Sequence, residues 1–433
     1  MHRSIIIGLI ALVIVAGVAV WLYLGQSSGD KPLNVVVITV DTLRPDRLGF
    51  GGHSRPTSPV MDQLAAESIV FPNVYSVAGW TLPSIATIFT GRYPRDHGAT
   101  DFHWALDATV PTLASILRAR GYDTRGFVSH LLLTPTYGVA EGFQSYDYSV
   151  LNIGHPHEVS TARQLTDLVI RSTGKLKEPY FLWVHYFDPH FEYVPHSRWS
   201  SFGMEDIDRY DQEIAFTDEQ LARLLAHLKR QGLDDRTILV FTADHGEEFG
   251  EHGDRFHYTL YEEVMRCPLL IKAPSVKAVI DESTVHQIDL LPTILSMLNI
   301  VPRESLPGRN LLGVDPGERA IFMERDRPPP FNQRGVIYGN YKLTVIEEVD
   351  PRSIPRKSQG TTSPVVNVIP GIYMYDLVND PGETTNIYNE EDPKAIELLV
   401  MLAEHFSVKN KPAHEVEVDE TLREKLRSLG YIN

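Results

Sequence analysis

Apolar residues gather in short continuous runs along this chain, and amphipathic stretches lie between the runs. The runs have strand length and occur at 33–40, 180–187, 237–243 and 267–273. Continuous apolar runs are typical of parallel strands that are buried on both faces. The amphipathic stretches repeat apolar residues at helical spacing and occur at 58–68, 111–121 and 218–232. Strands that alternate with helices predict an α/β fold, with a large, mostly parallel central sheet flanked by helices.

The pattern changes after about residue 300, where loop-like segments separate shorter apolar stretches. Strand candidates occur at 320–324, 335–339, 341–346 and 371–377, and a helix is expected at 393–406. Short strands close together in sequence favour antiparallel pairing. We therefore predict an α/β domain over 34–300 and a smaller C-terminal subdomain with an antiparallel sheet over 301–433, which completes the fold.

The N-terminus carries a separate apolar segment. Residues 5–24 contain no charged side chain and are about long enough to span a bilayer. Arg3 precedes the segment, which favours a cytoplasmic N-terminus. We predict a transmembrane anchor or a signal segment over 1–25, followed by a linker over 26–33. The segment is either kept or cleaved, and both cases place the remaining chain outside the cytoplasm, in the periplasm or at the cell surface.

Composition excludes some classes of function. The 433 residues carry a formal net charge of −16, which disfavours nucleic-acid binding because phosphate backbones need clustered Lys and Arg. The hydrophobic content of 43% is sufficient for a packed core. Cys267 is the single cysteine, so the chain has no internal disulfide, and its apolar surroundings predict a buried thiol.

Acidic and imidazole side chains follow three of the predicted strands. The first strand ends in Asp41, a second in Asp244 and His245, and a third in Asp188 and His190. Because the carboxyl ends of parallel strands lie at one edge of a sheet, these side chains are expected to lie together. Oxygen and nitrogen ligands of this kind suit Ca²⁺, Mn²⁺, Mg²⁺ or Zn²⁺. A second ion is left open, with Asp188, His252 and Thr42 as further candidates.

Two other segments carry candidate chemistry. Thr81 stands two residues before Pro83 and opens an apolar helical stretch, where backbone N–H groups attract anions. The alternative is that Thr81 only caps a helix. In the Gly-rich segment 244–257, His257 is a candidate acid or anion ligand, whereas Glu247 and Glu248 also fit a solvated acidic loop.

Five segments in order resemble the sulfatases of the alkaline-phosphatase-like superfamily. The segments read VDTLRPDRLGFGGHSRPTSPVMDQLA, TLPSIATIFTGRYPRDHG, HYFDPHFEY, TADHGEEFGEHG and MYDLVNDPGETTNI. The resemblance implies a metal-dependent hydrolase that acts on an anionic ester. It implies that Asp41, Thr81, Asp244 and His245 bind the metal. Thr81 is then also the nucleophile, His190 contacts the transferred group, and His257 stands where many sulfatases carry a substrate-binding Lys.

Three positions depart from the sulfatase pattern. Thr81 replaces the Cys or Ser that sulfatases convert to formylglycine, Ile85 replaces an Arg, and Thr42 replaces a second Asp. Threonine cannot yield the formylglycine aldehyde. The arrangement is similar to that of nucleotide pyrophosphatase/phosphodiesterases and lipoteichoic-acid-type phosphoglycerol transferases, in which a plain Thr is the nucleophile. This similarity favours a phosphate ester or diester over a sulfate ester.

Three hypotheses follow. The first is a hydrolase of a sulfate or phosphate ester derived from a glycan, a lipid or a nucleotide. The second is an envelope transferase of phosphoglycerol or phosphoethanolamine groups. The third is a non-catalytic relative that binds an anion or a glycan.

Overall fold

The computed structural model describes nine segments and four further residues of the chain. The segments are 31–152, 159–174, 176–232, 235–274, 276–314, 317–325, 331–348, 369–407 and 414–416, and the further residues are Glu420, Arg423, Glu424 and Leu426. The predicted membrane segment at 5–24 lies outside them. No helix within these segments is long and apolar enough to cross a bilayer. The described residues from Asn34 onward form one packed unit.

Strands and helices alternate through the first three quarters of this unit. The helices are α2 (Pro59–Ala66), α3 (Thr81–Thr90), α4 (Pro94–His97), α5 (Leu113–Arg118), α6 (Ala162–Thr173), α7 (Asp206–Arg230), α8 (Glu262–Met265), α9 (Leu290–Met297) and α10 (Pro393–Phe406). The longer strands are β1 (Asn34–Val40), β2 (Ile69–Tyr75), β4 (Asp123–Val128), β6 (Tyr180–Tyr186), β7 (Thr237–Ala243), β10 (Arg266–Lys272), β13 (Ile321–Arg325), β14 (Phe331–Tyr338), β15 (Tyr341–Glu348) and β16 (Gly371–Asp376). The short strands are β3 (Trp104–Ala105), β5 (Ser145–Asp147), β8 (Glu248–Phe249), β9 (Arg255–Phe256), β11 (Val279–Ile280), β12 (Val285–His286) and β17 (His414–Glu415).

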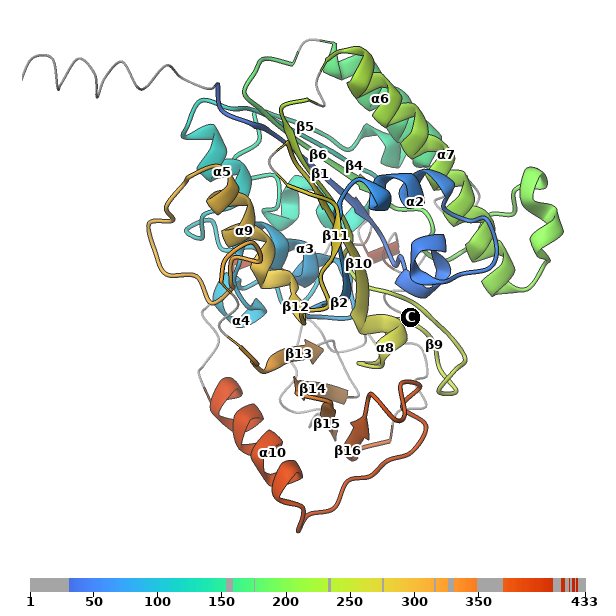
Figure 1. Ribbon diagram of the computed structural model, residues 1–433, viewed down its shortest axis with the longest axis vertical. Coiled ribbons are helices and arrows are strands. Elements are labelled where there is room, and N and C mark those ends of the chain that lie inside the picture. Colours follow the sequence, from blue (N-terminus) through green and yellow to red (C-terminus); the bar gives the residue numbers. More distant parts are fainter. Residues whose placement is uncertain are drawn as a thin grey trace, which may run out of the picture. The chain divides into compact units, whose positions relative to one another are not determined.

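The central sheet has the strand order β11-β2-β10-β7-β1-β6-β4-β5, and β12 also pairs with β2. Strand β1 lies in the middle and pairs in parallel with both β6 and β7. Helices α2, α6 and α7 cover one face of the sheet, and α3, α5 and α9 cover the other (Figure 1). Every residue of β1, β6 and β7 is buried. The predicted mostly parallel sheet with helices on both faces is confirmed.

Strand β10 departs from the expectation drawn from its apolar run. It pairs antiparallel with both β7 and β2. Its residues from Cys267 to Ile271 are nevertheless buried, as expected for the single cysteine. An apolar run indicates that a strand is buried on both faces. Helices that cover both faces of a sheet bury a strand in this way whether it is parallel or antiparallel to its neighbours.

Helix α7 is longer than the amphipathic pattern predicts, since it begins at Asp206 rather than near residue 218. Its first half buries polar side chains, among them Asp211. The Asp211 carboxylate accepts hydrogen bonds from Arg47 at 2.9 and 2.6 Å, and from Arg55 at 2.8 Å. The helix was predicted from the spacing of apolar residues. Its first half lacks that spacing because its buried positions are filled by polar side chains that have hydrogen-bond partners.

The C-terminal strands form a separate antiparallel sheet in the order β13-β14-β15-β16, as predicted. Helix α10 packs on this sheet through Ala395, Leu398 and Leu402, which meet Leu343 and Met374. This sheet and α10 lie below the central sheet in Figure 1. A second apolar cluster joins the two sheets and contains Tyr75, Leu260, Val264, Met265, Ile321, Met323 and Ile337.

A buried ion-pair network also ties the C-terminal sheet to α8. The Lys342 ammonium group on β15 lies 2.8 Å from Glu383 Oε1 and 3.3 Å from Glu262 Oε1. Glu383 Oε2 accepts a hydrogen bond from the backbone N–H of Glu262 at 2.7 Å. The side chains of Lys342 and Glu383 are fully buried. Loss of either charge would leave the other without compensation in a medium of low dielectric.

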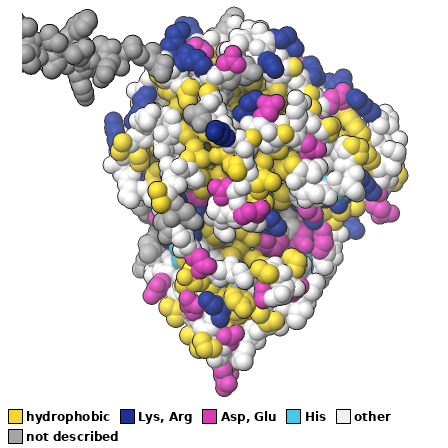
Figure 2. Space-filling model, in the orientation of Figure 1, with side chains coloured by type: hydrophobic (Ala, Val, Ile, Leu, Met, Phe, Trp, Pro, Cys, Tyr) yellow, Lys and Arg dark blue, Asp and Glu magenta, His cyan; other side chains and the backbone are white. Residues whose placement is uncertain are grey.

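The surface has a mixed charge pattern. Figure 2 shows Asp and Glu side chains interspersed with Lys and Arg on the visible face. Exposed ion pairs include Arg198–Glu219 and Arg255–Asp206. The net charge of −16 is therefore not collected into one acidic area on this face.

Replacing Lys342 by Ala is expected to lower the free energy of unfolding by about 3–5 kcal/mol, because it leaves Glu383 buried and unpaired. Urea denaturation of the full chain, followed by circular dichroism, measures this loss. The matched control is Lys394→Ala, since Lys394 makes an exposed ion pair with Glu397 and should change stability by less than about 1 kcal/mol. Equal effects of the two substitutions would contradict the expectation.

Candidate active site

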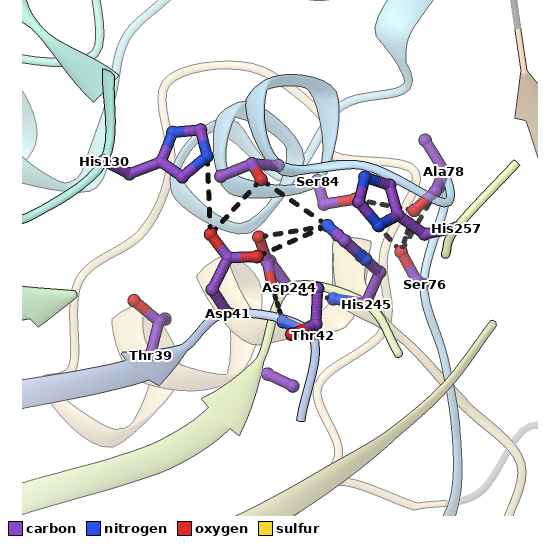
Figure 3. Close-up of polar contacts among 12 residues, drawn as sticks. Thr39, Asp41, Thr42, Ser76, Ala78, Ser84, His130, Asp244, His245 and His257 are labelled. Atoms are coloured by element: carbon purple, nitrogen blue, oxygen red, sulfur yellow. Dashed lines mark hydrogen bonds and ion pairs between the residues drawn. The ribbon is translucent and has the colours of Figure 1, made fainter. Parts of the chain in front are cut away.

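The carboxyl ends of β1 and β7 bring two acidic residues together. Asp41 follows β1, and Asp244 and His245 follow β7. The two strands are parallel neighbours with Val40 opposite Ala243, so their next residues emerge side by side. All three side chains are fully buried. Figure 3 shows Asp41, Asp244 and His245 directed toward one another.

Backbone groups orient the Asp244 carboxylate. Its Oδ1 accepts hydrogen bonds from the backbone N–H of Thr42 at 3.2 Å and of His245 at 2.9 Å. Thr42 has a φ of 51°, which turns its N–H toward Asp244. The Tyr210 hydroxyl holds this turn by donating to the Thr42 carbonyl at 2.6 Å. The other Asp244 oxygen, Oδ2, has no hydrogen-bond partner among the described residues and lies 3.5 Å from His245 Nε2.

Three potential ligand atoms converge at this point. Asp41 Oδ1, like Asp244 Oδ2, is buried without a hydrogen-bond partner among the described residues, and it lies 3.6 Å from His245 Nε2. The Nδ1–H of His245 donates to the Gly246 carbonyl at 2.9 Å, which leaves the lone pair of a neutral ring on Nε2. Two unsatisfied carboxylate oxygens and one imidazole lone pair around a single point fit a divalent cation.

The electrostatics of the cluster favour the same conclusion. Burial, together with the nearby charges of Asp244 and Glu247, raises the pKa of Asp41 well above its ordinary value. Burial likewise raises the pKa of Glu247. Carboxylates that crowd a dry site resist ionisation unless a positive charge compensates them. A divalent cation supplies that charge.

Thr81 places a hydroxyl at the edge of this cluster. Its Oγ1 lies 3.4 Å from Asp41 Oδ2 and 3.5 Å from His245 Nε2. Thr81 is the first residue of α3, and Trp80 is the N-cap, so the expected helix start is confirmed and the capping alternative is wrong. Because free N–H groups at a helix start attract anions, this end of α3 suits an anionic group beside Thr81.

A hydrogen-bond network fixes the segment before α3. The Ser84 hydroxyl donates to the Ala78 carbonyl at 2.8 Å and lies 3.0 Å from the Ser76 hydroxyl. Gln287 accepts from Ser76 Oγ at 3.2 Å and donates to the Asp244 carbonyl at 2.6 Å. The Gln287 amide thus joins the end of β7 to the segment that leads into Thr81, and the Ser84 hydroxyl is directed away from the carboxylates.

Two further imidazoles lie beside the cluster. The Nδ1 atom of His190 donates to the Phe191 carbonyl at 2.7 Å, and the His190 and His257 ring centres are 5.2 Å apart. His257 Nδ1 lies 3.0 Å from Glu247 Oε1, and its ring centre is 4.7 Å from that of His245. Glu247 and Glu248 are both buried, so the solvated-loop interpretation of these residues is wrong.

The three candidates for a second ion lie in different surroundings. The Asp188 carboxylate accepts hydrogen bonds from Ser160 Oγ at 2.5 Å and from the Thr161 backbone and hydroxyl, so it anchors the start of α6. His252 Nε2 lies 3.3 Å from Glu263 Oε2, and these two residues form with Glu383 a separate group that could hold a metal ion. The Thr42 backbone N–H donates to Asp244. The structure therefore gathers Asp41, Thr81, Asp244, His245, His190 and His257, but not Asp188 or His252.

Two histidines of the centre escaped the sequence analysis. His185 Nε2 lies 3.3 Å and His130 Nε2 lies 3.5 Å from Asp41 Oδ2. His185 sits inside the apolar run of β6, opposite Thr39 of β1, so strand register would have placed it near Asp41. His130 follows β4, whose sequence DTRGFV is too polar to be recognised as a buried strand.

Comparison with family models and known proteins finds matches over most of the chain. The sulfatase family model matches residues 33–300, and the model for the C-terminal part of N-sulphoglucosamine sulphohydrolase matches residues 248–411. An ulvan-active sulfatase of Formosa agariphila is 25% identical over 435 residues, which cover 88% of this chain and 83% of that protein. Arylsulfatase K of Bos taurus is 28% identical over 433 residues, covering 84% of this chain and 79% of that protein.

Solved structures share the fold. The phosphonate monoester hydrolase of Agrobacterium radiobacter superimposes with a TM-score of 0.72 at 20% identity, over 88% of this chain and 100% of that chain. A structure in complex with D-glucosamine-2-N,6-O-disulfate superimposes with a TM-score of 0.69 at 19% identity, over 87% of this chain and 98% of that chain.

Asp41→Asn is expected to weaken binding of a divalent cation by more than about 100-fold. Substitution of a residue that only hydrogen-bonds to a metal ligand typically lowers the affinity by at most about 100-fold, and loss of a ligand should cost more. Isothermal titration with Mn²⁺ measures this change. Asp188→Asn should leave the affinity unchanged, because the Asp188 carboxylate faces α6. Affinity of the wild-type protein should fall as the pH is lowered, since burial raises the pKa of Asp41 and protons compete with the cation. Equal affinities of Asp41→Asn and wild type would contradict the assignment.

Proposed function

Because the chain belongs to the sulfatase family of hydrolases, we propose that it cleaves an ester of sulfuric or phosphoric acid with the hydroxyl of Thr81 as the nucleophile. The observation that carries this proposal is the position of Thr81 Oγ1. It lies within 3.5 Å of both Asp41 and His245, at the start of a buried helix. Cys267, the one other plausible nucleophile, is a buried thiol on β10.

Asp41, Asp244 and His245 would hold a divalent cation, which would supply Lewis-acid charge that makes a neighbouring hydroxyl easier to ionise. Ca²⁺, Mn²⁺, Mg²⁺ and Zn²⁺ all accept such ligands, and the imidazole favours Mn²⁺ or Zn²⁺. Thr81 Oγ1 gives its proton to water and forms a bond to the sulfur or phosphorus atom, while the bond to the leaving oxygen breaks. The N–H groups at the start of α3 and His190 stabilise the negative charge on the other oxygens. Water then cleaves the Thr81 ester and restores the hydroxyl.

We propose that His257 acts on the leaving oxygen. Its Nδ1 is held by Glu247 Oε1 at 3.0 Å, so a protonated His257 carries its second hydrogen on Nε2. This hydrogen passes to the leaving oxygen as the ester bond breaks, which avoids release of an unstable alkoxide. Glu247 orients the ring and stabilises its charged form, a role that a buried carboxylate beside an imidazole performs well.

An unmodified Thr81 favours phosphorus over sulfur. Thr81 cannot yield the formylglycine aldehyde that sulfatases use. Thr81 has one hydroxyl, so its ester must instead be broken by attack of water on the central atom. A Thr phosphate ester suits that step, because phosphoryl transfer needs mainly positioning and charge stabilisation. We therefore propose turnover of phosphate esters, with phosphodiesters as the first substrates to try.

The similar proteins favour a glycan as the group that carries the ester. Their names include an ulvan-active sulfatase and an N-acetylglucosamine-6-O-sulfatase of Bacteroides thetaiotaomicron. The apolar segment at 5–24 favours a location outside the cytoplasm for this chain. We propose an enzyme that is anchored by this segment and acts on an anionic glycan or lipid ester. Proteinase treatment of intact spheroplasts, which should degrade the folded part, tests the location.

Thr81→Ala is expected to lower kcat by at least about 10³-fold, because it removes the attacking oxygen. Thr81→Ser should retain much of the activity, since it keeps the hydroxyl. The control is Ser84→Ala, in which a buried hydroxyl is lost on the same helix but away from Asp41. Ser84→Ala should keep kcat and lower stability by about 1 kcal/mol.

The assay compares matched aryl sulfate, phosphate monoester and phosphodiester substrates with Mn²⁺, Ca²⁺ or Zn²⁺. Thr81-dependent release from the phosphate esters supports the whole proposal, and Thr81-dependent release from the sulfate would overturn only the preference for phosphorus. Full activity of Thr81→Ala would overturn the nucleophile. Products that appear only with an added acceptor alcohol would identify a transferase. Metal binding without any turnover would identify a binding protein.

A further inference from the structure

The Asp41 carboxylate is approached from two sides by imidazoles. His245 faces Oδ1, whereas His130 and His185 face Oδ2 at 3.5 and 3.3 Å. Figure 3 shows His130 and His245 on opposite sides of Asp41. We propose that His130 and His185 are positioning residues, which hold Asp41 Oδ2 with Nε2–H donors and thereby leave Oδ1 to the cation. This inference rests on the metal centre of the proposed function.

The tautomer of His130 follows from its other nitrogen. His130 Nδ1 accepts a hydrogen bond from the backbone N–H of Leu132 at 3.0 Å. An acceptor nitrogen carries no hydrogen, so the ring hydrogen is on Nε2, which faces Asp41. A nitrogen with a hydrogen cannot ligate a metal. His130 is therefore a hydrogen-bond donor to Asp41 and not part of the ligand set.

A chain of hydrogen bonds fixes His185 in the same form. The Trp183 indole N–H, which is only a donor, lies 3.0 Å from Thr39 Oγ1, and this oxygen lies 2.8 Å from His185 Nδ1. These are the two side-chain hydrogen bonds of the Thr39 hydroxyl within the described part of the chain. If His185 Nδ1 carried a hydrogen, the buried Thr39 hydroxyl would have no acceptor. Thr39 therefore donates to Nδ1, and His185 Nε2 carries its hydrogen toward Asp41.

His185 also lies close enough to Asp41 and Asp244 to be considered a ligand. One atom from each of the three residues falls within 4.8 Å of the others. His185 is nevertheless not a ligand. While Thr39 donates to Nδ1, the ring hydrogen is on Nε2, so Nε2 has no lone pair for a metal ion. His245 has the opposite pattern, because its Nδ1–H donates to a carbonyl and its Nε2 is a lone pair. The cluster thus contains two kinds of imidazole. In His130 and His185, Nδ1 accepts a hydrogen bond and Nε2 carries the hydrogen, whereas in His245, Nδ1 donates and Nε2 has the lone pair.

The consequence is a fixed division of the two Asp41 oxygens. Donors on Oδ2 prevent the carboxylate from rotating about its terminal bond, so Oδ1 stays directed at His245 Nε2. Outer hydrogen bonds of this kind typically contribute about 10–100-fold to metal affinity.

The test measures Mn²⁺ affinity and the nitrogen ligands of bound Mn²⁺ in the full chain. His130→Ala and His185→Ala should each raise the Kd for Mn²⁺ about 10–100-fold, as loss of an outer hydrogen bond does. The Gln variants place an N–H near the former Nε2 and should recover most of the affinity. Pulsed electron paramagnetic resonance should show the same single imidazole nitrogen, that of His245, in wild type and in all four variants.

The matched control is His97→Gln. His97 is equally buried, and its Nδ1 accepts from the backbone N–H two residues later, but its Nε2 lies against Thr87 at 3.1 Å. This variant should keep the Mn²⁺ affinity of the wild-type protein. A second variant, Thr39→Val, preserves the shape of β1 and removes the hydroxyl that donates to His185. It should raise the Kd even if the His185 variants fail to fold.

The outcomes separate this inference from the proposed function. Loss of a nitrogen signal in His185→Gln would make His185 a ligand and overturn the inference, while the metal centre would stand. Unchanged affinity in His130→Ala, His185→Ala and Thr39→Val would overturn it as well. A wild-type chain that binds no divalent cation would overturn the metal centre itself, together with the inference.

Discussion

The burial of two carboxylates side by side is the constraint on which the rest of the molecule depends. Asp41 and Asp244 end neighbouring parallel strands in the middle of the sheet, where helices on both faces exclude water. Like charges at this depth repel each other strongly, so the fold must either neutralise them or supply positive charge. Backbone N–H groups satisfy one oxygen of Asp244, imidazoles face one oxygen of Asp41, and the remaining two oxygens are left for a cation.

The central sheet and the chemistry of the site are connected through this constraint. Parallel strands that start at one edge and end at the other necessarily deliver their last residues to the same place. Helix α3 then brings Thr81 and a positive helix end to that edge from one face of the sheet. The C-terminal sheet contributes no ligand to the cluster. It packs against the segment that carries His257. The contacts are the ion pair of Lys342 with Glu383 and the apolar cluster around α8.

Sequence reasoning recovered the parts of the structure that depend on local pattern. The buried runs gave β1, β6 and β7, and the residues after them gave Asp41, Asp244, His245 and His190 as candidates, which remain predictions. It missed β4 and the first half of α7, since both contain polar residues that are buried by tertiary contacts. It consequently missed His130. His185 was overlooked because it lies within an apolar run, and its role depends on the pairing of β6 with β1, which no local pattern contains.

The Gln287 amide has a consequence for how the centre opens. By bonding both the Asp244 carbonyl and Ser76, it ties the segment before α3 to the sheet, while every residue of α3 is buried. These contacts restrain the side of the centre that carries Thr81. Passage of substrate and product would then depend on the segments that carry His190 and His257, and motion during turnover would be concentrated there rather than around Thr81.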